Sequence, residues 1–472
     1  MAELNSENIE EIIQRVIKHL ETNPSEISKT MNSSPVFKDV QSAVSASKQA
    51  QAIWKKVSKE KKTKIIEALR ESMHEHADSF SRKALEETGM GRYEDKVIKH
   101  HNAAQATPGL EDLETQSWAG DKGLVYEDYA PYGVVAAITP STHPIPVLFN
   151  SMIIITAPGN SVVFNVHPAA KKVSTDAIRI FNEVIIKNGG PANLITMIEE
   201  PTLDTANELF RHPDVALIAA TGGPGLVQSA FAAGKKVIAA GPGNPPVLVD
   251  KTADINLAAQ KIIEGASFDN NILCIAEKEI FVEEPIYQQF LTAMEKAGAV
   301  KLTQPQIEQL KNKAFIKNNT GKISVNRNFV GKNARILAEA VGLSISDEVR
   351  LLFGEAEFDC PFVQEEQMMP YLPVVKIKNV DQGILLAVKA EHGYKHTAMV
   401  HSNNLENITK FSKAIDTDIV VVNGTSLAGN GGMAGEAYFS HTIASPTGEG
   451  ICTPRNFGRI RRLSISGNLD II

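Results

Sequence analysis

The sequence predicts two consecutive α/β domains, each built on a parallel sheet with helices on both faces. The first observation is that strand-like apolar runs alternate with amphipathic helical stretches over residues 133–240. A second series of the same kind follows over residues 246–422. Strands that alternate with helices are typical of βαβ units, which build doubly wound parallel sheets. A length of 472 residues allows two or three domains, each with its own core.

The individual strands are predicted from short apolar runs bounded by turn residues. In the first series these runs lie at residues 133–139, 161–166, 193–198, 215–219 and 236–240, with helical periodicity over 169–187 and 203–211 between them. In the second series they lie at residues 246–249, 278–282, 350–353, 371–377, 397–401 and 418–422.

The segments outside these two series define the remaining elements. Residues 37–106 predict three helices, over 40–54, over 59–77, and a third through Ser81 and Glu94. Near the other end of the sequence, residues 461–465 predict a strand in a glycine-punctuated segment. We therefore expect a first domain of residues 37–118 and 131–240, a second of 241–444, and a small unit of 119–130 and 445–472.

Residues 1–20 predict a separate amphipathic helix. Six apolar residues recur at helical spacing, with charged and polar residues between them: Ile9, Ile12, Ile13, Val16, Ile17 and Leu20. Residues 21–36 are rich in Asn, Ser, Thr and Pro and predict a flexible linker. A short amphipathic helix on a polar tether indicates a docking peptide, and the alternative is a helix that packs on its own domain.

Composition limits the class of protein. The formal net charge of -7 argues against a nucleic-acid-binding surface. No run of about 18 apolar residues is present, so we expect no membrane span, and the first residues do not resemble a secretory signal. The three cysteines, Cys274, Cys360 and Cys452, are far apart in sequence, which favours a reduced protein in the cytoplasm or in a space enclosed within it. No metal site is predicted.

Cys274 is the candidate nucleophile. It lies between a helix that ends near Glu264 and the strand that begins at Lys278, after the polar run Asp269, Asn270 and Asn271. Loops between elements commonly carry catalytic groups, and a thiolate that adds to a carbonyl needs donors for the resulting oxyanion. For this role we expect a thiol pKa below the ordinary value of about 8.5. Taken alone, a structural cysteine remains the simpler interpretation.

The sequence around Cys274 resembles the nucleophile segment of the aldehyde dehydrogenase superfamily. It is most similar to that of the CoA-acylating propionaldehyde and acetaldehyde dehydrogenases of bacterial microcompartments. The segment is Phe268-Asp-Asn-Asn-Ile-Leu-Cys274-Ile-Ala-Glu-Lys. Further blocks occur in the family's order: Thr139-Pro-Ser-Thr-His-Pro144, Ala220-Thr-Gly-Gly-Pro-Gly225, Ala240-Gly-Pro-Gly-Asn-Pro-Pro246, Glu365-Glu366 and Pro446-Thr-Gly-Glu-Gly450. The resemblance implies the aldehyde dehydrogenase fold, with a variant Rossmann domain, a catalytic domain and an oligomerisation arm in a homodimer or homotetramer.

The resemblance also implies roles for individual residues. The residue implied to stabilise the oxyanion is His143, where many acylating relatives carry asparagine, and Thr142 is the other candidate donor. The residues implied to bind NAD are Thr139, Pro140, Asn165, His167, Pro168, Thr221, Gly222, Gly223, Gly241 and Glu366. The Thr221-Gly-Gly turn joins a strand to a helix, a junction whose N–H groups suit a pyrophosphate. Asn165 stands where many relatives have a lysine near the adenosine ribose, so NADP is less favoured than NAD. Glu366 matches a glutamate that binds the nicotinamide ribose.

Ala239 separates two reaction types. In hydrolytic relatives a glutamate at the matching position activates water against the thioester, and alanine has no such capacity. The acyl-enzyme is therefore expected to wait for an external thiol, which favours CoA. The implied function is the reversible oxidation of a short-chain aldehyde to acyl-CoA, with propionaldehyde the first candidate and acetaldehyde the second. The resemblance also implies that the enzyme works inside a bacterial microcompartment and that its residues 1–20 contact the shell. The alternatives are a hydrolytic aldehyde dehydrogenase and a non-catalytic shell-associated protein.

Overall fold

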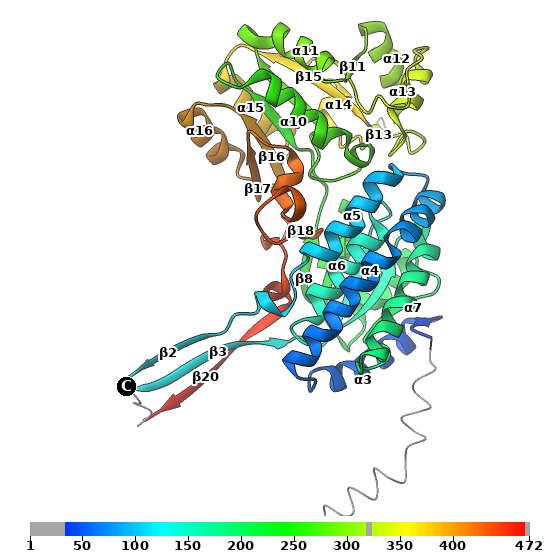
Figure 1. Ribbon diagram of the computed structural model, residues 1–472, viewed down its shortest axis with the longest axis vertical. Helices are drawn as coiled ribbons and strands as arrows, with labels where there is room; N and C mark the ends of the chain where they lie inside the picture. The colour runs from blue at the N-terminus through cyan, green and yellow to red at the C-terminus, as the bar shows by residue number, and fades with distance from the viewer. Residues whose placement is uncertain (1–33, 318–322, 468–472) are drawn as a thin grey trace, which may run out of the picture.

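The structure is a computed structural model that describes residues 34–317 and 323–467, and it consists of two α/β domains and a projecting arm (Figure 1). The expected docking helix over residues 1–20, and the expected linker up to residue 33, lie outside the described residues. The predicted fold class is confirmed. Within the described ranges, none of the helices is long and apolar enough to cross a bilayer.

The first domain contains a six-stranded parallel sheet in the order β1-β6-β5-β4-β7-β8. Its strands are β1 (Val36–Phe37), β4 (Val134–Thr139), β5 (Ser161–Val166), β6 (Ile195–Ile198), β7 (Val215–Thr221) and β8 (Lys236–Ala240). After β4 the chain adds β5 and β6 on one side and then crosses back to place β7 on the other. This reversal leaves a crevice at the carboxyl ends of β4 and β7, a usual site for ligands in such sheets.

Helices cover both faces of the first sheet, and Figure 1 shows the face toward the viewer. One face packs mainly against α4 (Lys59–Thr88), α5 (Tyr93–Ala106), α6 (Pro144–Thr156) and α7 (Lys171–Lys187). The other packs against α3 (Val40–Trp54), α8 (Leu203–Arg211) and α9 (Pro224–Phe231). Because both faces are covered, the strands are almost wholly buried and apolar, which explains why they were visible in the sequence.

The second domain contains a seven-stranded parallel sheet in the order β11-β14-β15-β10-β9-β16-β17. Its strands are β9 (Pro246–Val249), β10 (Glu279–Glu283), β11 (Val300–Lys301), β14 (Leu352–Glu355), β15 (Tyr371–Ile377), β16 (Thr397–His401) and β17 (Ile419–Val422). Its helices are α10 (Ile255–Ser267), α11 (Tyr287–Lys296), α12 (Gln304–Ala314), α13 (Ala334–Ala340), α14 (Pro361–Gln364), α15 (Val380–Ala390) and α16 (Leu405–Ile415). Two short antiparallel pairs complete the fold, β12 (Phe315–Lys317) with β13 (Ile323–Val325), and β18 (Ile443–Ala444) with β19 (Gly450–Ile451).

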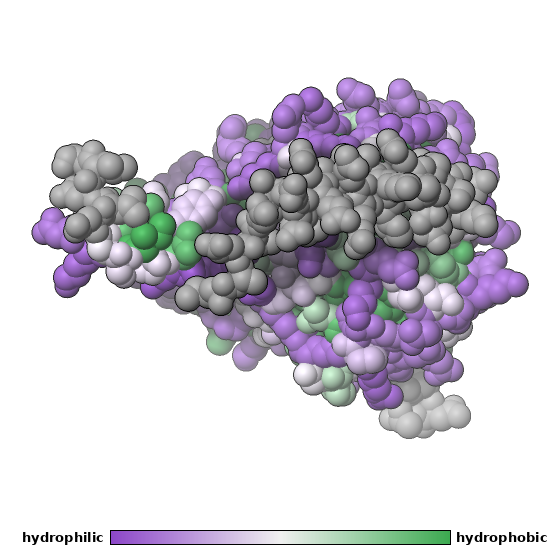
Figure 2. All heavy atoms as spheres, turned by 90° about the horizontal axis from the view of Figure 1, so that it is seen from below, coloured by the Kyte–Doolittle hydropathy of each residue, from purple (hydrophilic) through white to green (hydrophobic). Residues whose placement is uncertain are grey.

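The arm is an antiparallel sheet of β2 (Gln116–Gly120), β3 (Gly123–Pro131) and β20 (Gly458–Ser466). It projects from the body at the lower left of Figure 1 and leaves large apolar side chains exposed, among them Trp118, Ile460 and Leu463. Seen from below, one group of apolar residues lies at the left of Figure 2, the side to which the arm projects, and others lie nearer the centre of this face. The strand predicted over residues 461–465 is the central part of β20.

One helical prediction was wrong, and one helix was missed. The break expected between residues 77 and 81 is absent, because α4 is one helix of 30 residues that begins at the Ser58 cap and ends at Gly89 in the left-handed conformation. Ser81 fits inside the helix because its hydroxyl donates to the carbonyl of Ala77 and contacts the ring of His100. The other error is α6, which the sequence did not show because every one of its residues is buried and no polar face marks its period.

Candidate active site

A cavity of about 220 Å³ lies where the carboxyl ends of β4, β7 and β8 meet the loop that carries Cys274. Nine of the predicted site residues line it: Pro140, Thr142, His143, Thr221, Gly222, Gly223, Gly241, Cys274 and Glu366. The fold therefore brings the predicted nucleophile, both oxyanion candidates and much of the predicted NAD site to one place. Most of the remaining wall is apolar, including Val147, Ile272, Leu273, Ile275, Met368 and Ile443.

The loop before Cys274 has an unusual backbone. Asp269, Asn270 and Asn271 all have positive φ, at 47°, 57° and 64°. Asp and Asn adopt this left-handed conformation more readily than other residues with a side chain, which accounts for the polar run seen in the sequence. The amide of Asn271 donates to the carbonyls of Ala266 and Glu277 at 2.8 and 2.9 Å, so the loop is tied to the elements before and after it.

Lys278 anchors the same loop. Its ammonium is buried and donates to the carbonyl oxygens of Asn271 and Leu273, at 2.8 and 3.2 Å, and to the side chain of Asn271. These bonds fix the peptide planes on the N-terminal side of Cys274. They also place a positive charge near the thiol, where it favours the thiolate.

The expectation of a lowered pKa for Cys274 was wrong for the free site. Burial and, to a smaller extent, the nearby carboxylate of Glu366 raise the pKa of the thiol to about 12, against the opposing effect of Lys278. The residue itself stays partly open to the cavity, but its apolar surroundings solvate a thiolate poorly. At neutral pH the free enzyme therefore holds a thiol, and catalysis requires a group that removes its proton.

Glu366 is the only carboxylate among the described residues that line the cavity. Burial raises its pKa to about 7, while Lys278 and the backbone N–H of Gly243 act in the opposite direction. A carboxyl group with a pKa near 7 exchanges protons readily at neutral pH. Glu366 is therefore placed and poised to accept a proton as well as to bind a ligand.

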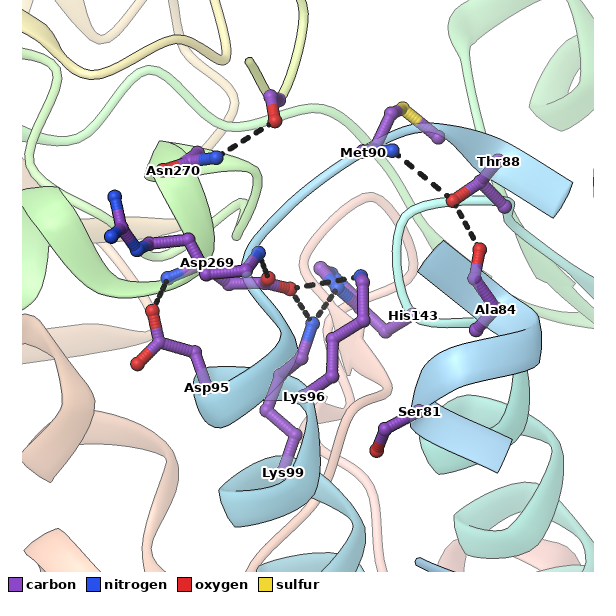
Figure 3. Close-up of polar contacts among 12 residues, drawn as sticks. Ser81, Ala84, Thr88, Met90, Asp95, Lys96, Lys99, His143, Asp269 and Asn270 are labelled. Atoms are coloured by element: carbon purple, nitrogen blue, oxygen red, sulfur yellow. Dashed lines mark hydrogen bonds and ion pairs between the residues drawn. The ribbon is translucent and has the colours of Figure 1, made fainter. Parts of the chain in front are cut away.

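His143 lies at the N-cap position of α6, in the wall of the cavity. Its ring stacks on the ring of His441, with 5.4 Å between centroids and 18° between planes. The ammonium of Lys99 lies 3.1 Å from its Nδ1 atom, and Lys99 also pairs with Asp269, in the loop that leads to Cys274 (Figure 3). Burial, followed by the charges of Lys99, His441 and Lys96, holds the pKa of His143 well below its ordinary value, and a hydrogen bond with the backbone of Thr142 opposes this shift. The ring is therefore neutral.

The predicted pyrophosphate site has the expected backbone. Gly223 is the N-cap of α9 and has no side-chain cap, and a side chain added at Gly223 or Gly225 would meet open space. At the end of β4, the hydroxyl of Thr139 is buried without a hydrogen-bond partner among the described residues. An uncapped helix start with open space before it and an unpaired hydroxyl at the same sheet edge are suited to a polar ligand.

Four predicted NAD residues do not line the cavity: Thr139, Asn165, His167 and Pro168. The side-chain amide of Asn165 is hydrogen-bonded to the start of α8: it donates to the carbonyl of Thr202 and accepts from the hydroxyl of Thr205. His167 accepts the N–H of Ala169 in its own turn. All four stay at the carboxyl ends of β4 and β5, where a dinucleotide larger than this cavity can extend.

Ala239 also lies away from the cavity. It is fully buried on β8 and packs in the apolar core with Val227 and Val237, while its N–H donates to the hydroxyl of Thr447. The alanine supplies no base to the site, as expected. A glutamate substituted there would enter the core, so we do not expect such a change to create a hydrolytic enzyme.

Sequence reasoning missed the residues that support the site. These are Lys96, Lys99, Lys278, Met368, Asn430 and His441. Lys278 stands within the resembling segment and could have been noticed there. Lys99 and His441 carry no signal, because they reach His143 from segments far apart in the sequence.

Comparison with known proteins agrees with this geometry. The model of the aldehyde dehydrogenase family matches residues 21–435. An acetylating acetaldehyde dehydrogenase of Salmonella typhimurium is 44% identical over 462 residues, covering 97% of this chain and 98% of the relative.

Two solved structures extend the similarity to the fold. The propionaldehyde dehydrogenase of the Clostridium phytofermentans fucose utilisation microcompartment has a TM-score of 0.90 at 44% identity, covering 93% of this chain and 100% of its own. The Rhodopseudomonas palustris propionaldehyde dehydrogenase, solved with bound CoA and an acylated cysteine, has a TM-score of 0.89 at 40% identity, covering 92% and 98%. The chain belongs to the aldehyde dehydrogenase family.

Proposed function

We propose that this protein is an NAD-dependent, CoA-acylating aldehyde dehydrogenase that converts a short-chain aldehyde to its acyl-CoA through a thioester on Cys274. The observation that carries the proposal is the position of Cys274 on the wall of a small cavity at the carboxyl edge of the first sheet. The names of the relatives, an acetylating acetaldehyde dehydrogenase and propionaldehyde dehydrogenases, support the same reaction.

The first half-reaction begins with transfer of the Cys274 proton to Glu366, whose pKa of about 7 suits it to accept. The thiolate then adds to the aldehyde carbonyl carbon, and the carbonyl electrons move to oxygen. The N–H of Cys274 and the side chain of His143, with Thr142 nearby, stabilise the oxyanion. As the C–O double bond forms again, hydride leaves the carbon, and a thioester to Cys274 remains. Bound NAD supplies the hydride acceptor.

In the second half-reaction the sulfur of CoA attacks the thioester carbonyl and the bond from that carbon to Cys274 breaks, in ping-pong order. The proton of the CoA thiol passes to the departing Cys274 sulfur, and Glu366 releases the proton it holds to solvent. The acyl-enzyme persists until then because Glu366, the only carboxylate among the described residues that line the cavity, carries the proton taken from Cys274 and cannot also accept one from water. The reaction is reversible, so the same residues reduce acyl-CoA to the aldehyde when NADH is abundant.

The cavity supports a short, apolar acyl group. Its volume of about 220 Å³ also has to admit the reacting end of the nicotinamide, and its wall includes Val147, Leu273 and Ile443. We place propionaldehyde first and acetaldehyde second, since an apolar pocket gains about 0.8 kcal/mol for each additional buried methylene group.

The test is NADH formation with and without CoA on acetaldehyde, propionaldehyde and butyraldehyde. With CoA, turnover and acyl-CoA are expected. Without CoA, NADH formation should stop after at most one equivalent per site. Cys274→Ala should abolish both reactions, and Cys360→Ala, remote from the cavity, should retain them. Continuous NADH formation without any thiol would support the hydrolytic alternative, and full activity of Cys274→Ala would exclude the mechanism.

We further propose that the protein works inside a bacterial microcompartment, where residues 1–20 contact the shell, and that the arm pairs with a second copy in a homodimer or homotetramer. The microcompartment origin of the Clostridium phytofermentans relative supports the first point. The exposed apolar side chains of the arm support the second, and sedimentation of a variant with Ile460→Asp and Leu463→Asp tests it.

A further inference from the structure

Lys99 is a buried lysine that contacts both His143 and the loop that leads to Cys274. It lies on α5, keeps only 4% of its surface exposed, and points its ammonium between Asp269 and His143 (Figure 3). The ammonium pairs with the Asp269 carboxylate and lies 3.1 Å from Nδ1 of His143. Burial lowers the pKa of Lys99 to about 8, with Asp269 opposing the shift, so the side chain remains an ammonium at neutral pH.

An ammonium group has donors and no acceptor, so its hydrogen bond to Nδ1 requires a lone pair on that nitrogen. A neutral imidazole carries one proton, which must then lie on Nε2. Stacking on His441 fixes the plane of the ring, and the ring forms part of the wall that also contains Cys274.

We propose that Lys99 is a positioning residue that holds His143 in the Nε2–H tautomer and so presents an N–H donor to the oxyanion formed on the substrate of Cys274. This inference rests on the proposed function. It explains how a histidine replaces the asparagine of many acylating relatives. An asparagine amide always carries N–H donors, whereas a histidine needs its tautomer to be selected.

A purely structural role for Lys99 makes a different prediction. Lys99 also neutralises Asp269, and loss of that charge alone would disturb the loop that leads to Cys274. Lys96 provides a matched control. It lies one turn earlier on α5, is equally buried, and contacts the same carboxylate oxygen at 3.3 Å, but within the described part of the chain it has no hydrogen bond to His143.

The experiment compares Lys99→Met and Lys96→Met in aldehyde oxidation with CoA, in the wild-type and His143→Asn backgrounds. In the wild-type background, Lys99→Met should lower kcat by about 100-fold, the scale of one oxyanion donor, with little change in the aldehyde KM. Lys96→Met should cost about tenfold less than Lys99→Met. In the His143→Asn background the two lysine variants should have equal effects. Equal losses in the wild-type background, or an undiminished Lys99→Met effect in the His143→Asn background, would overturn the proposal.

Two further measurements keep the result decisive. Lys99→Gln retains uncharged N–H donors and should lose no more activity than Lys96→Met, which also covers the case in which Lys99→Met fails to fold. Imidazole ¹⁵N NMR of the free enzyme, assigned by loss of the signal in His143→Asn, should show a pyridine-like shift for Nδ1 and a pyrrole-like shift for Nε2. The opposite pattern would refute the tautomer assignment even if the enzyme made no acyl-CoA, so this failure is distinct from failure of the proposed function.

Discussion

At the residue scale, Cys274 and Glu366 are the proposed proton donor and proton acceptor of the first step. Both line one apolar cavity, and burial raises the pKa of each, to about 12 for the thiol and about 7 for the carboxyl. The same desolvation that suppresses the thiolate in the free enzyme brings the pKa of Glu366 close to neutral pH, where its carboxylate can accept a proton. A nucleophile kept as a thiol is protected from oxidation until a substrate is bound.

The raised thiol pKa predicts the pH dependence of alkylation. Inactivation by iodoacetamide without substrate should accelerate about tenfold per pH unit between roughly pH 7 and pH 9, with no plateau, because the thiolate fraction grows tenfold per unit below the pKa. The rate constants are measured from residual activity, and mass spectrometry of labelled Cys274 assigns the site. A plateau near neutral pH would show that the free enzyme already holds a thiolate and would contradict this account.

At the scale of elements, the loop over residues 268–278 decides where the thiol lies. Asp269, Asn270 and Asn271 make a left-handed turn, and Lys278 binds the carbonyl oxygens that precede Cys274. The polar residues of this turn could be recognised in the sequence, but their left-handed conformation could not be predicted. Positive φ depends on tertiary contacts as well as on residue type. The longer strands of the two sheets were easier to predict, since burial on both faces makes them largely apolar runs, whereas the half-buried β1 and β11 were missed.

Lys278→Met tests the anchoring of this loop. Methionine keeps the length of the side chain but removes the donors to Asn271 and Leu273 and the positive charge near the thiol. We expect kcat to fall by about 10- to 100-fold and the thermal midpoint to decrease, as a lost charged donor typically costs about 1–3 kcal/mol.

Iodoacetamide labelling of Cys274 should also slow in Lys278→Met, because the thiolate loses a nearby stabilising cation. Lys261→Met, on the surface of α10, serves as the control and should match the wild type in all three measurements. Unchanged kcat and unchanged labelling in Lys278→Met would show that the loop is held without this lysine.

The whole molecule joins two sheets so that the carboxyl edge of the first faces the Cys274 loop of the second. The order of elements along the chain predicted both sheets. It did not predict the contacts that cross between distant segments, such as Lys99 with Asp269 or His143 with His441. Those contacts depend on how the domains pack, which periodicity within one segment does not encode.

The packing of the first sheet also predicts the effect of removing residues 1–20. The chain enters the described body through β1, the edge strand of the first sheet, whereas the cavity lies at β4, β7 and β8 toward the other edge. Deletion should therefore leave kcat and KM of the purified enzyme within about twofold, as expected for a change remote from the site.

The deletion should release the enzyme from purified microcompartments, and residues 1–20 fused to a fluorescent protein should be retained by them. Ile13→Asp with Val16→Asp should mimic the deletion by placing charge on the apolar stripe. Loss of soluble activity on deletion would instead indicate a helix that packs on its own domain.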